Sequence, residues 1–370
     1  MRNNELPDGL HPDTLGVRAG QMRTGFEETA EPMFLNSGYV YESAEAAEAS
    51  FNGEKQRFVY SRYGNPTVAM FQERLRQIEG AEACFATSSG MSAVFVSLAA
   101  LLGAGSRLVA SRALFGSCYV ICAEILPRWG VETVFVDGSD LEQWREALSV
   151  PTDAVFFETP SNPMQELVDI RAVCDLAHEA GAQVVVDNVF ATVLHQKPLE
   201  LGADVVVYST TKHIDGQGRV LGGAVLGTEE YIAGPVQNLM RHAGFGMSAF
   251  NAWVLLKGLE TMSMRVERMS ANALEVARFL QSHPAVERVT YPMLESHPQY
   301  ELARSQMSGG GSVVTFGLRY DDDDVDRGKK ECFALLNALQ IIDISNNLGD
   351  AKSLGTHPAT TTHASMEPAD

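Results

Sequence analysis

The sequence predicts an α/β protein with a mostly parallel β-sheet in a large domain, followed by a smaller α+β domain at the C-terminus. Two observations support this fold class. Between residues 68 and 208, short β-branched runs alternate with stretches that have helical apolar spacing. Two of these runs, 183–187 and 204–208, are largely apolar, which is typical of central strands buried on both faces of a sheet.

The elements of the large domain follow a less regular segment. Residues 1–70 are rich in Gly, Pro and Asn, and the break at Gly64-Asn65-Pro66 predicts an irregular loop over 56–67. The next stretch, 68–79, predicts a helix that ends at Gly80. Strands are then predicted over 83–87, 107–111, 132–136, 154–158, 183–187 and 204–208, with helices over 91–102 and 170–180.

The C-terminal part has a different pattern. Residues 250–280 predict one long helix or two consecutive helices, before strands over 286–291 and 312–318 and a helix over 329–339. We therefore divide the chain into an N-terminal arm (1–70), a large domain (71–255) and a C-terminal domain (256–370). The acidic run from Asp321 to Asp324 lacks the spacing of a metal-binding loop and predicts a solvated loop. No closing strand and helix follow, so we expect the C-terminal domain to be incomplete at its end.

Composition and charge disfavour several classes of partner. The chain has 370 residues, of which 45% are hydrophobic, so it can bury a substantial core. With 47 acidic and 28 basic residues, its net charge of −19 disfavours binding to nucleic acid or to anionic lipid. Sequence patterns for a membrane span and for a signal peptide are both absent. Five cysteines without a Cys-x-x-Cys pair fit reduced thiols, so we expect a cytoplasmic protein.

Three polar motifs stand where predicted strands end, which is where open α/β sheets bind ligands. The first is Ser88-Ser89-Gly90-Met91, between a strand and a helix. Free backbone N–H groups and the helix dipole favour a phosphate at such a place. An ordinary helix N-cap has the same residue types, so this motif alone leaves both interpretations open.

The other two motifs end the two apolar strands. Asp187 ends one of them, and a carboxylate there is costly unless it is paired; a simple loop cap is the alternative. Lys212 follows the other strand, after Ser209, Thr210 and Thr211. A desolvated lysine can become a nucleophile, and a surface lysine after a Ser/Thr turn is the alternative.

Together the three motifs predict a site for pyridoxal 5′-phosphate (PLP). The hydroxyls of Ser209 and Thr211 would bind the same phosphate as Gly90. Lys212 would join the cofactor covalently, and Asp187 would keep its pyridine nitrogen protonated, so that the ring can accept electrons from a carbanion. The dinucleotide and P-loop glycine motifs are absent, and the histidines show no metal-ligand spacing, so no metal is expected.

The motifs resemble those of the Cys/Met-metabolism family of PLP-dependent enzymes, and the resemblance extends from about residue 14 to residue 363. This family includes cystathionine γ-synthases, cystathionine γ-lyases and O-acylhomoserine sulfhydrylases. The resemblance implies a transferase of fold type I, the aspartate-aminotransferase-like fold. It rests on Tyr60-Ser-Arg-Tyr-Gly-Asn-Pro-Thr67, Ser88-Ser-Gly-Met91, Pro160-Ser-Asn-Pro163, Val186-Asp-Asn188, Ser209-Thr-Thr-Lys212 and His357-Pro-Ala359.

The resemblance also implies a role for each matching residue. Lys212 would hold PLP and shuttle protons, Asp187 would pair with the pyridinium nitrogen, and Asn162 would lie near the 3′-oxygen of the ring. Tyr60 and Arg62 would reach the phosphate of a neighbouring subunit, so the arm would complete a partner's site in a homotetramer built from dimers. The phosphate ligands within one chain would be Ser89, Gly90, Met91, Ser209 and Thr211.

Two departures from the common family pattern narrow the expected activity. Many relatives stack a tyrosine on the cofactor ring where this chain has Phe115. Phe115 cannot transfer a proton, so Lys212 or water would carry out any step that the tyrosine performs in those relatives. The run from Asn346 to Leu354, which contains Asn347, resembles the sulfhydrylase branch. Phe115 and the run 215–223 resemble the sulfhydrylases that use O-succinylhomoserine.

The resemblance therefore implies a γ-replacement in methionine biosynthesis. Lys212 would remove the Cα proton of O-succinylhomoserine, succinate would leave from Cγ, and sulfide would add there to give homocysteine. Asn347 is a candidate substrate contact, while Arg219 would either attract the succinyl carboxylate or form a structural salt bridge. A cystathionine γ-synthase, a γ-lyase, an O-acetylhomoserine sulfhydrylase and a non-catalytic scaffold remain alternatives. The family's arginine for the substrate carboxylate would lie beyond residue 370.

Overall fold

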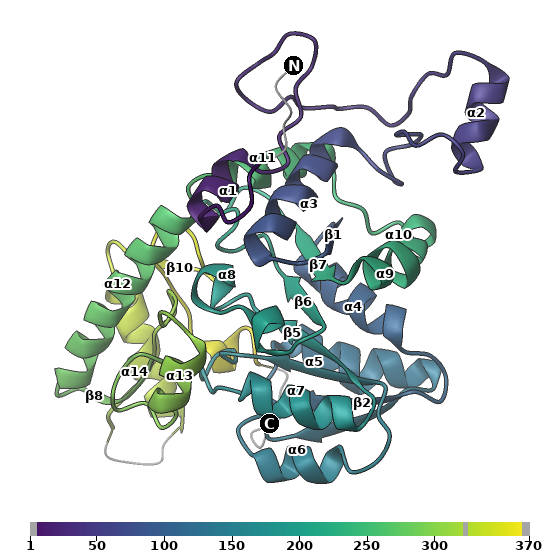
Figure 1. Ribbon diagram of the computed structural model, residues 1–370. Coiled ribbons are helices and arrows are strands. Elements are labelled where there is room, and N and C mark those ends of the chain that lie inside the picture. Colours follow the sequence, from purple (N-terminus) through teal and green to yellow (C-terminus); the bar gives the residue numbers. More distant parts are fainter. Residues whose placement is uncertain (1–5, 321–324, 365–370) are drawn as a thin grey trace.

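The computed structural model describes residues 6–320 and 325–364, so the predicted loop from Asp321 to Asp324 lies outside the described residues. A seven-stranded sheet in the order β1-β7-β6-β5-β4-β2-β3 forms its centre (Figure 1). β7 is antiparallel to both neighbours, and the other strand pairs are parallel, which confirms the mostly parallel α/β fold. The strands are β1 (Ala83–Thr87), β2 (Arg107–Ser111), β3 (Glu132–Val136), β4 (Ala154–Glu158), β5 (Gln183–Asp187), β6 (Val205–Tyr208) and β7 (Gly223–Gly227).

Five strands of the main sheet have the bounds that the sequence predicts, whereas β6 begins at Val205 instead of residue 204 and no bounds were predicted for β7. Asp204 is excluded because its carboxylate accepts the Val184 N–H at 2.7 Å, in the place of a backbone partner. Of the strands predicted over 286–291 and 312–318, the first ends at Thr290 and the second begins at Thr315. Since β1 and β6 flank the single reversed strand β7, they run in the same direction. The carboxyl ends of β1, β4, β5 and β6 therefore meet at one edge of the sheet.

Helices cover both faces of the sheet. On one face, Ala93 of α4 and Cys118 of α5 pack on Phe156 and Val185. The opposite face packs against α6 and α7 in one part and against α3 and α11 in another. The helices and helical turns of this domain are α3 (Pro66–Glu79), α4 (Gly90–Leu101), α5 (Gly116–Val120), η1 (Ile121–Ile125), η2 (Leu126–Trp129), α6 (Leu141–Ala147), α7 (Ile170–Glu179), α8 (Thr192–His195), η3 (Pro198–Leu201), α9 (Glu229–Tyr231), η4 (Ile232–Val236) and α10 (Gln237–Ala243).

The stretch 250–280 forms two helices, α11 (Ala249–Leu259) and α12 (Met262–Ser282). They separate where Arg265 Nη2 donates to the Gly258 carbonyl at the end of α11, at 2.8 Å. The remaining elements lie beside the main sheet, next to α12 (Figure 1). They are β8 (Val286–Thr290) and β9 (Thr315–Leu318), an antiparallel pair; α13 (Tyr300–Gln306) and α14 (Val325–Ala338); the parallel pair β10 (Asp343–Ile344) and β11 (Leu354–Gly355); and η5 (Pro358–Thr360).

The N-terminal segment contains two short helices that the sequence pattern did not predict, α1 (Pro12–Arg18) and α2 (Ala44–Phe51). α1 packs on α3, whereas α2 projects from the body of the molecule (Figure 1). A buried ion network anchors the segment between them, because Glu31 binds both Arg74 of α3 and Lys257 of α11. None of the helices in residues 6–320 and 325–364 is both long and apolar enough to cross a membrane.

Candidate active site

The three motifs predicted to bind PLP meet at the carboxyl edge of the sheet. β1 leads into Ser89 and Gly90, β5 ends at Asp187, and β6 leads into Ser209 and Lys212. The structure thus brings together groups that are more than a hundred residues apart along the chain. The reversed strand β7 makes this possible, because it pairs with both β1 and β6.

The start of α4 and the residue after β6 form one concave surface. Ser89 is the N-cap of α4, and its hydroxyl accepts the Ser92 N–H at 3.1 Å. Gly90 lies so close to Ser209 that a Cβ atom at position 90 would be 2.5 Å from the Ser209 Cβ. The first N–H groups of the helix, including that of Met91, have no partner within the helix, so they are available to an anion. This arrangement fits a phosphate group.

Thr211 lies beside this surface but is also part of the fold. Its hydroxyl donates to the Gly222 carbonyl at 3.2 Å and accepts the Gly222 N–H at 3.1 Å. Both bonds tie the segment after β6 to the residue before β7. Thr211 therefore fixes the shape of the loop that carries Ser209 and Lys212.

Lys212 has one partner that the sequence analysis also singled out. Its Nζ donates to Asn347 Oδ1 at 2.8 Å. Burial lowers the pKa of Lys212, while the negative charge of Asp187 opposes that shift. The loop that carries Asn347 is pressed against the lysine segment, because a Cβ at Gly349 would lie 2.6 Å from the His213 backbone nitrogen. A glycine is required at this position, which has a φ of +71°.

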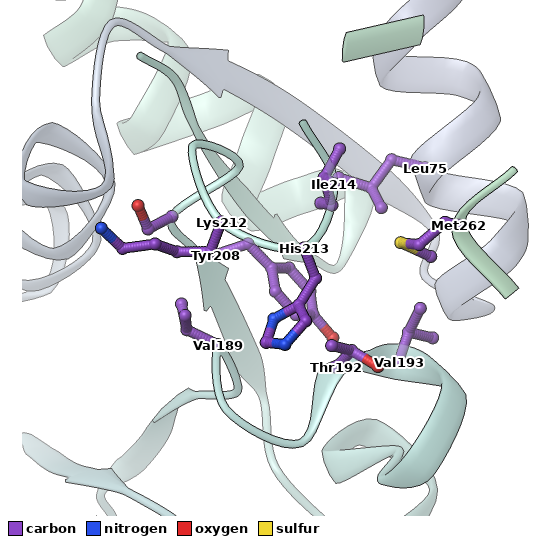
Figure 2. Close-up of a pocket in the computed structure, with 10 residues that line it drawn as sticks. Leu75, Val189, Thr192, Val193, Tyr208, Lys212, His213, Ile214 and Met262 are labelled. Atoms are coloured by element: carbon purple, nitrogen blue, oxygen red, sulfur yellow. The ribbon is translucent and has the colours of Figure 1, made fainter. Parts of the chain in front are cut away.

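The side chains of Lys212 and His213 leave the loop in different directions (Figure 2). His213 points toward Val189 and Thr192, and its Nε2 lies 2.7 Å from Ser312 Oγ. Burial lowers the pKa of His213 to about 4. The small cavity at this place has a volume of about 10 Å³, which matches one water molecule, so it is a packing void behind the lysine segment. It is lined by Leu75, Val189, Thr192, Val193, Tyr208, Ser209, Lys212, His213, Ile214 and Met262.

Asp187 is buried, with 8% of its surface exposed. Its Oδ1 accepts the Val189 N–H at 3.1 Å. Burial raises the pKa of Asp187 to about 7, against the opposing effects of the Val189 N–H and the Lys212 charge. A buried carboxyl with a raised pKa gains stability from a cationic partner, so this position fits a protonated pyridine nitrogen.

Glu158 is a buried acid that the sequence analysis did not single out. It ends β4 as Asp187 ends β5, and the two residues are paired in register. Its Oε2 accepts the backbone N–H of Phe115 at 2.9 Å, at the start of α5. The same signal that marked Asp187, an acid at the end of an apolar strand, is present at Glu158 as well.

Asn162 and Arg219, two other predicted site residues, have contacts elsewhere in the chain. The Asn162 carbonyl lies 3.1 Å from Nε2 of His363. Arg219 forms an ion pair with buried Asp215, with 2.9 Å between Nε and Oδ1. This contact is the structural salt bridge that the sequence analysis kept as the alternative for Arg219.

Tyr60 and Arg62 form a separate group on the surface of the chain. The Arg62 guanidinium lies 5.4 Å from the Tyr60 ring centre and 4.8 Å from that of Tyr63. Arg62 also donates to the carbonyl of Arg241 in α10. Tyr60 keeps 41% of its surface exposed. Both side chains are thus placed to contact a molecule outside this chain.

Comparisons with known proteins agree with this geometry. The sequence profile of the family described as "Cys/Met metabolism PLP-dependent enzyme" matches residues 13–370. An O-succinylhomoserine sulfhydrylase of Mycobacterium tuberculosis is 69% identical, over 98% of this chain and 89% of the relative. One from Pseudomonas aeruginosa is 46% identical, over 98% and 88%. A crystal structure of cystathionine gamma synthase from Xanthomonas oryzae pv. oryzae, in complex with aminoacrylate and cysteine, has a TM-score of 0.90 at 31% identity, covering 98% and 90%.

Proposed function

Because the chain belongs to the Cys/Met-metabolism family of PLP-dependent enzymes, we propose that it catalyses a γ-replacement that makes homocysteine from O-succinylhomoserine and sulfide. PLP is the cofactor, and the enzyme is a transferase of the sulfhydrylase type. Two relatives with that name, 69% and 46% identical over nearly the whole chain, support this choice among the activities of the family.

The observation that carries the proposal is the hydrogen bond between Lys212 Nζ and Asn347 Oδ1, at 2.8 Å. Asn347 belongs to the run 346–354, which resembles the sulfhydrylase branch. The feature that distinguishes this branch therefore touches the amine that would perform the chemistry. Because Asn347 binds the reactive amine directly, we expect it to affect the reaction and not only the stability of the fold.

The chain's own residues divide the work between holding the cofactor and moving protons. Lys212 would hold the cofactor through Nζ and would act as the base for the substrate Cα proton, and burial would assist because it lowers the pKa of the amine. Asp187 would pair with the pyridine nitrogen, because burial raises the pKa of this carboxyl and a cationic partner would stabilise its charged form. When bound, PLP supplies an electron sink for the charge that develops at Cα. The phosphate would be held by Ser89, Gly90, Met91, Ser209 and Thr211, while Phe115 would lie against the ring and Asn162 near its 3′-oxygen.

The active assembly in this proposal is a homotetramer built from dimers that share their sites. The arm (1–70) of one subunit brings Tyr60 and Arg62 to the phosphate bound by the large domain (71–255) of its partner, and the C-terminal domain (256–370) contributes Asn347 to the substrate side. Large apolar side chains on the arm are widely exposed, which is typical of a surface that a partner covers. They are Phe26 (94%), Leu35 (69%), Val40 (91%) and Phe51 (62%).

A product assay tests the proposed reaction. The purified enzyme receives O-succinylhomoserine with either sulfide or cysteine, and mass spectrometry identifies homocysteine or cystathionine. We expect homocysteine as the main product, and a preference for cysteine would indicate a cystathionine γ-synthase instead. O-acetylhomoserine is assayed beside the succinyl ester, and faster turnover of the acetyl ester would overturn the choice of substrate.

A chemical trap tests the proposed attachment of the cofactor. Borohydride reduction followed by peptide mass mapping should locate a pyridoxyl adduct on Lys212. The Lys212→Ala variant should lose the adduct, the visible absorbance of the bound cofactor and turnover. An adduct on another lysine would show that the assignment of Lys212 is wrong.

A further inference from the structure

The end of β4 places a second carboxyl beside Asp187. Glu158 and Asp187 are register partners in parallel strands, which lie about 4.8 Å apart. Both side chains point to the face of the sheet that α4 and α5 cover, because they alternate with Phe157 and Val186, which belong to the core on the opposite face. Glu158 is 3% exposed and Asp187 8%. Two acids thus share one buried place at the proposed cofactor ring.

The surroundings of the pair favour a single negative charge. Burial and the charge of Asp187 raise the pKa of Glu158 well above its usual range. The positive charge of Lys212 opposes the rise in the pKa of Asp187. The Cys118 thiol of α5 adds no positive charge, and burial together with the two acids raises its own pKa. Arg112 follows β2, the other neighbour of β4. Asp187, which is stabilised by the charge of Lys212, is therefore the acid that ionises, and Glu158 keeps its proton.

Glu158 also holds the backbone of the residue proposed to stack on the ring. Its Oε2 accepts the Phe115 N–H at 2.9 Å, at the N-terminal end of α5. In a protonated carboxyl, one oxygen accepts this bond as a carbonyl and the other carries the proton. A single side chain thereby binds the residue proposed at the ring face and acts electrostatically on the acid proposed at the ring nitrogen.

We propose that Glu158 is a positioning residue that acts as a neutral acid. It keeps the net charge of the Glu158–Asp187 pair at −1, and it fixes the backbone of Phe115, the residue proposed to stack on the cofactor ring. This inference rests on the proposed placement of the cofactor nitrogen at Asp187. It assigns a role to a side chain that acts through two neighbours and not through contact with the substrate.

Variants at Glu158 in the cofactor-loaded enzyme test this role. In Glu158→Gln, which is also neutral and keeps an acceptor for Phe115, the PLP dissociation constant should stay within about 3-fold of the wild-type value. The midpoint of the pH titration of the bound cofactor's visible absorbance should not move. The infrared carbonyl band of a protonated carboxylic acid should disappear in the difference spectrum against wild type.

Removing the acceptor gives the opposite result. Glu158→Ala should weaken PLP binding about 10-fold and alter the shape of the visible band, because Phe115 loses its anchor. Glu79→Gln is a matched control, since it removes another fully buried carboxyl, one that binds Tyr208, while Glu158 is retained. It should keep the infrared band of Glu158 and the wild-type titration midpoint.

Three results would overturn the inference. A shifted titration midpoint in Glu158→Gln would mean that Glu158 carries charge, and a surviving infrared band in that variant would assign the proton elsewhere. Unchanged binding and absorbance in Glu158→Ala would exclude a positioning role, and the Glu158→Gln readouts decide the question if Glu158→Ala does not fold. Failure of the proposed reaction looks different, because the product assay would then change while these readouts stay the same. Failure of the proposed cofactor placement would leave the wild-type enzyme itself without lysine-bound absorbance.

Discussion

Buried acids are the side chains that set the electrostatics of this protein. Asp187, Glu158 and Glu79 are each less than a tenth exposed. Each has a raised pKa, chiefly because burial disfavours the charged form. Such groups lower the free energy of unfolding once they ionise, unless a cation or hydrogen bonds compensate. Two of them lie at the proposed cofactor site, where the cofactor nitrogen would offset this cost.

Glu79 lies apart from the cofactor residues and gives a direct test of this effect. Its carboxylate accepts the Tyr208 hydroxyl at 2.7 Å, and burial raises its pKa from 4.5 to about 7. Between these values the folded protein binds the extra proton, so the free energy of unfolding falls as the pH rises. In Glu79→Gln the free energy of unfolding should fall less over this pH range, by up to about 3 kcal/mol. Urea unfolding at a series of pH values measures this difference.

The control for that measurement is Glu82→Gln, which changes an exposed acid three residues away. This substitution removes one acidic charge but no buried carboxyl, so a difference between the two variants reports on the burial of Glu79. Equal pH dependence in all three proteins would show that Glu79 titrates as an ordinary surface acid.

The contact of Asn347 with Lys212 predicts a selective loss of turnover. Asn347→Ala removes a hydrogen bond to the amine, so kcat should fall about 10- to 100-fold, while cofactor absorbance stays close to that of wild type. Asn346→Ala is the matched control in the same loop, because the Asn346 amide instead accepts the Thr356 hydroxyl, at 2.6 Å. Similar kcat values in the two variants would contradict a direct effect of Asn347 on Lys212.

Single residues were predictable from the sequence only where the family motifs name them. Asp187 ends one apolar strand, Lys212 closely follows another, and both residues match family motifs, so the two signals agree. Glu158 also ends an apolar strand, but the signal from the strand end was not applied to it. The ion pair of Arg219 with Asp215 depends on how the segment 215–219 folds back on itself, which residue spacing does not specify.

At the scale of elements, the junction of β1 and α4 with the end of β6 determines the phosphate surface. The backbone of Gly90 approaches Ser209 so closely that it leaves no space for a side chain. A methyl group there would push the two segments apart. The helix end and the hydroxyl of Ser209 would then no longer face the same point.

Gly90→Ala should therefore weaken PLP binding by about 10-fold or more, as measured by titration of the apoenzyme. The control is Gly103→Ala, just beyond the other end of α4, where a Cβ would meet no atom within 4 Å. That variant should bind PLP like the wild-type protein. If both variants bind PLP normally, the phosphate surface does not depend on this close approach.

Strands were easier to predict than short helices. Most strands of the main sheet, apart from the edge strand β3, are buried on both faces, so the middle of each strand is apolar. Helices α5, α6, α8 and α9 have three to seven residues, and a stretch of that length completes too few turns to show a helical period. The long helices α3, α4 and α7 were predicted because their periodicity extends over at least ten residues.

At the scale of the whole molecule, the position of the arm separates two parts of the proposed site. Lys212 lies at the edge of the sheet, whereas Arg62 lies against α10 with Tyr60 and Tyr63. The arm's exposed apolar side chains are consistent with a partner subunit there. The sequence motif predicted which residues of the arm would reach a site. The position of the arm relative to a partner subunit depends on contacts between chains, and a pattern within one chain does not specify these contacts.

A hybrid experiment tests the sharing of sites between subunits. Arg62→Ala and Lys212→Ala should each be nearly inactive alone. In an isologous dimer that contains one of each, one site keeps both residues, so random mixing should restore about a quarter of the wild-type activity. Co-expression with two different affinity tags provides the mixed assembly. No recovery in the purified hybrid would show that each chain completes its own site.

The pairing of β1 with β7 has a consequence for how the protein is made. In the sheet, β1 at one edge pairs with β7, which joins Ala83 to Gly227. A ribosome synthesises the chain from its N-terminus, so β1 waits without its hydrogen-bonding neighbour until the strand ending at Gly227 has emerged. Gly90 and Ser209 come together in the same late step. The proposed phosphate surface can therefore be complete only after translation has passed the whole of the central sheet.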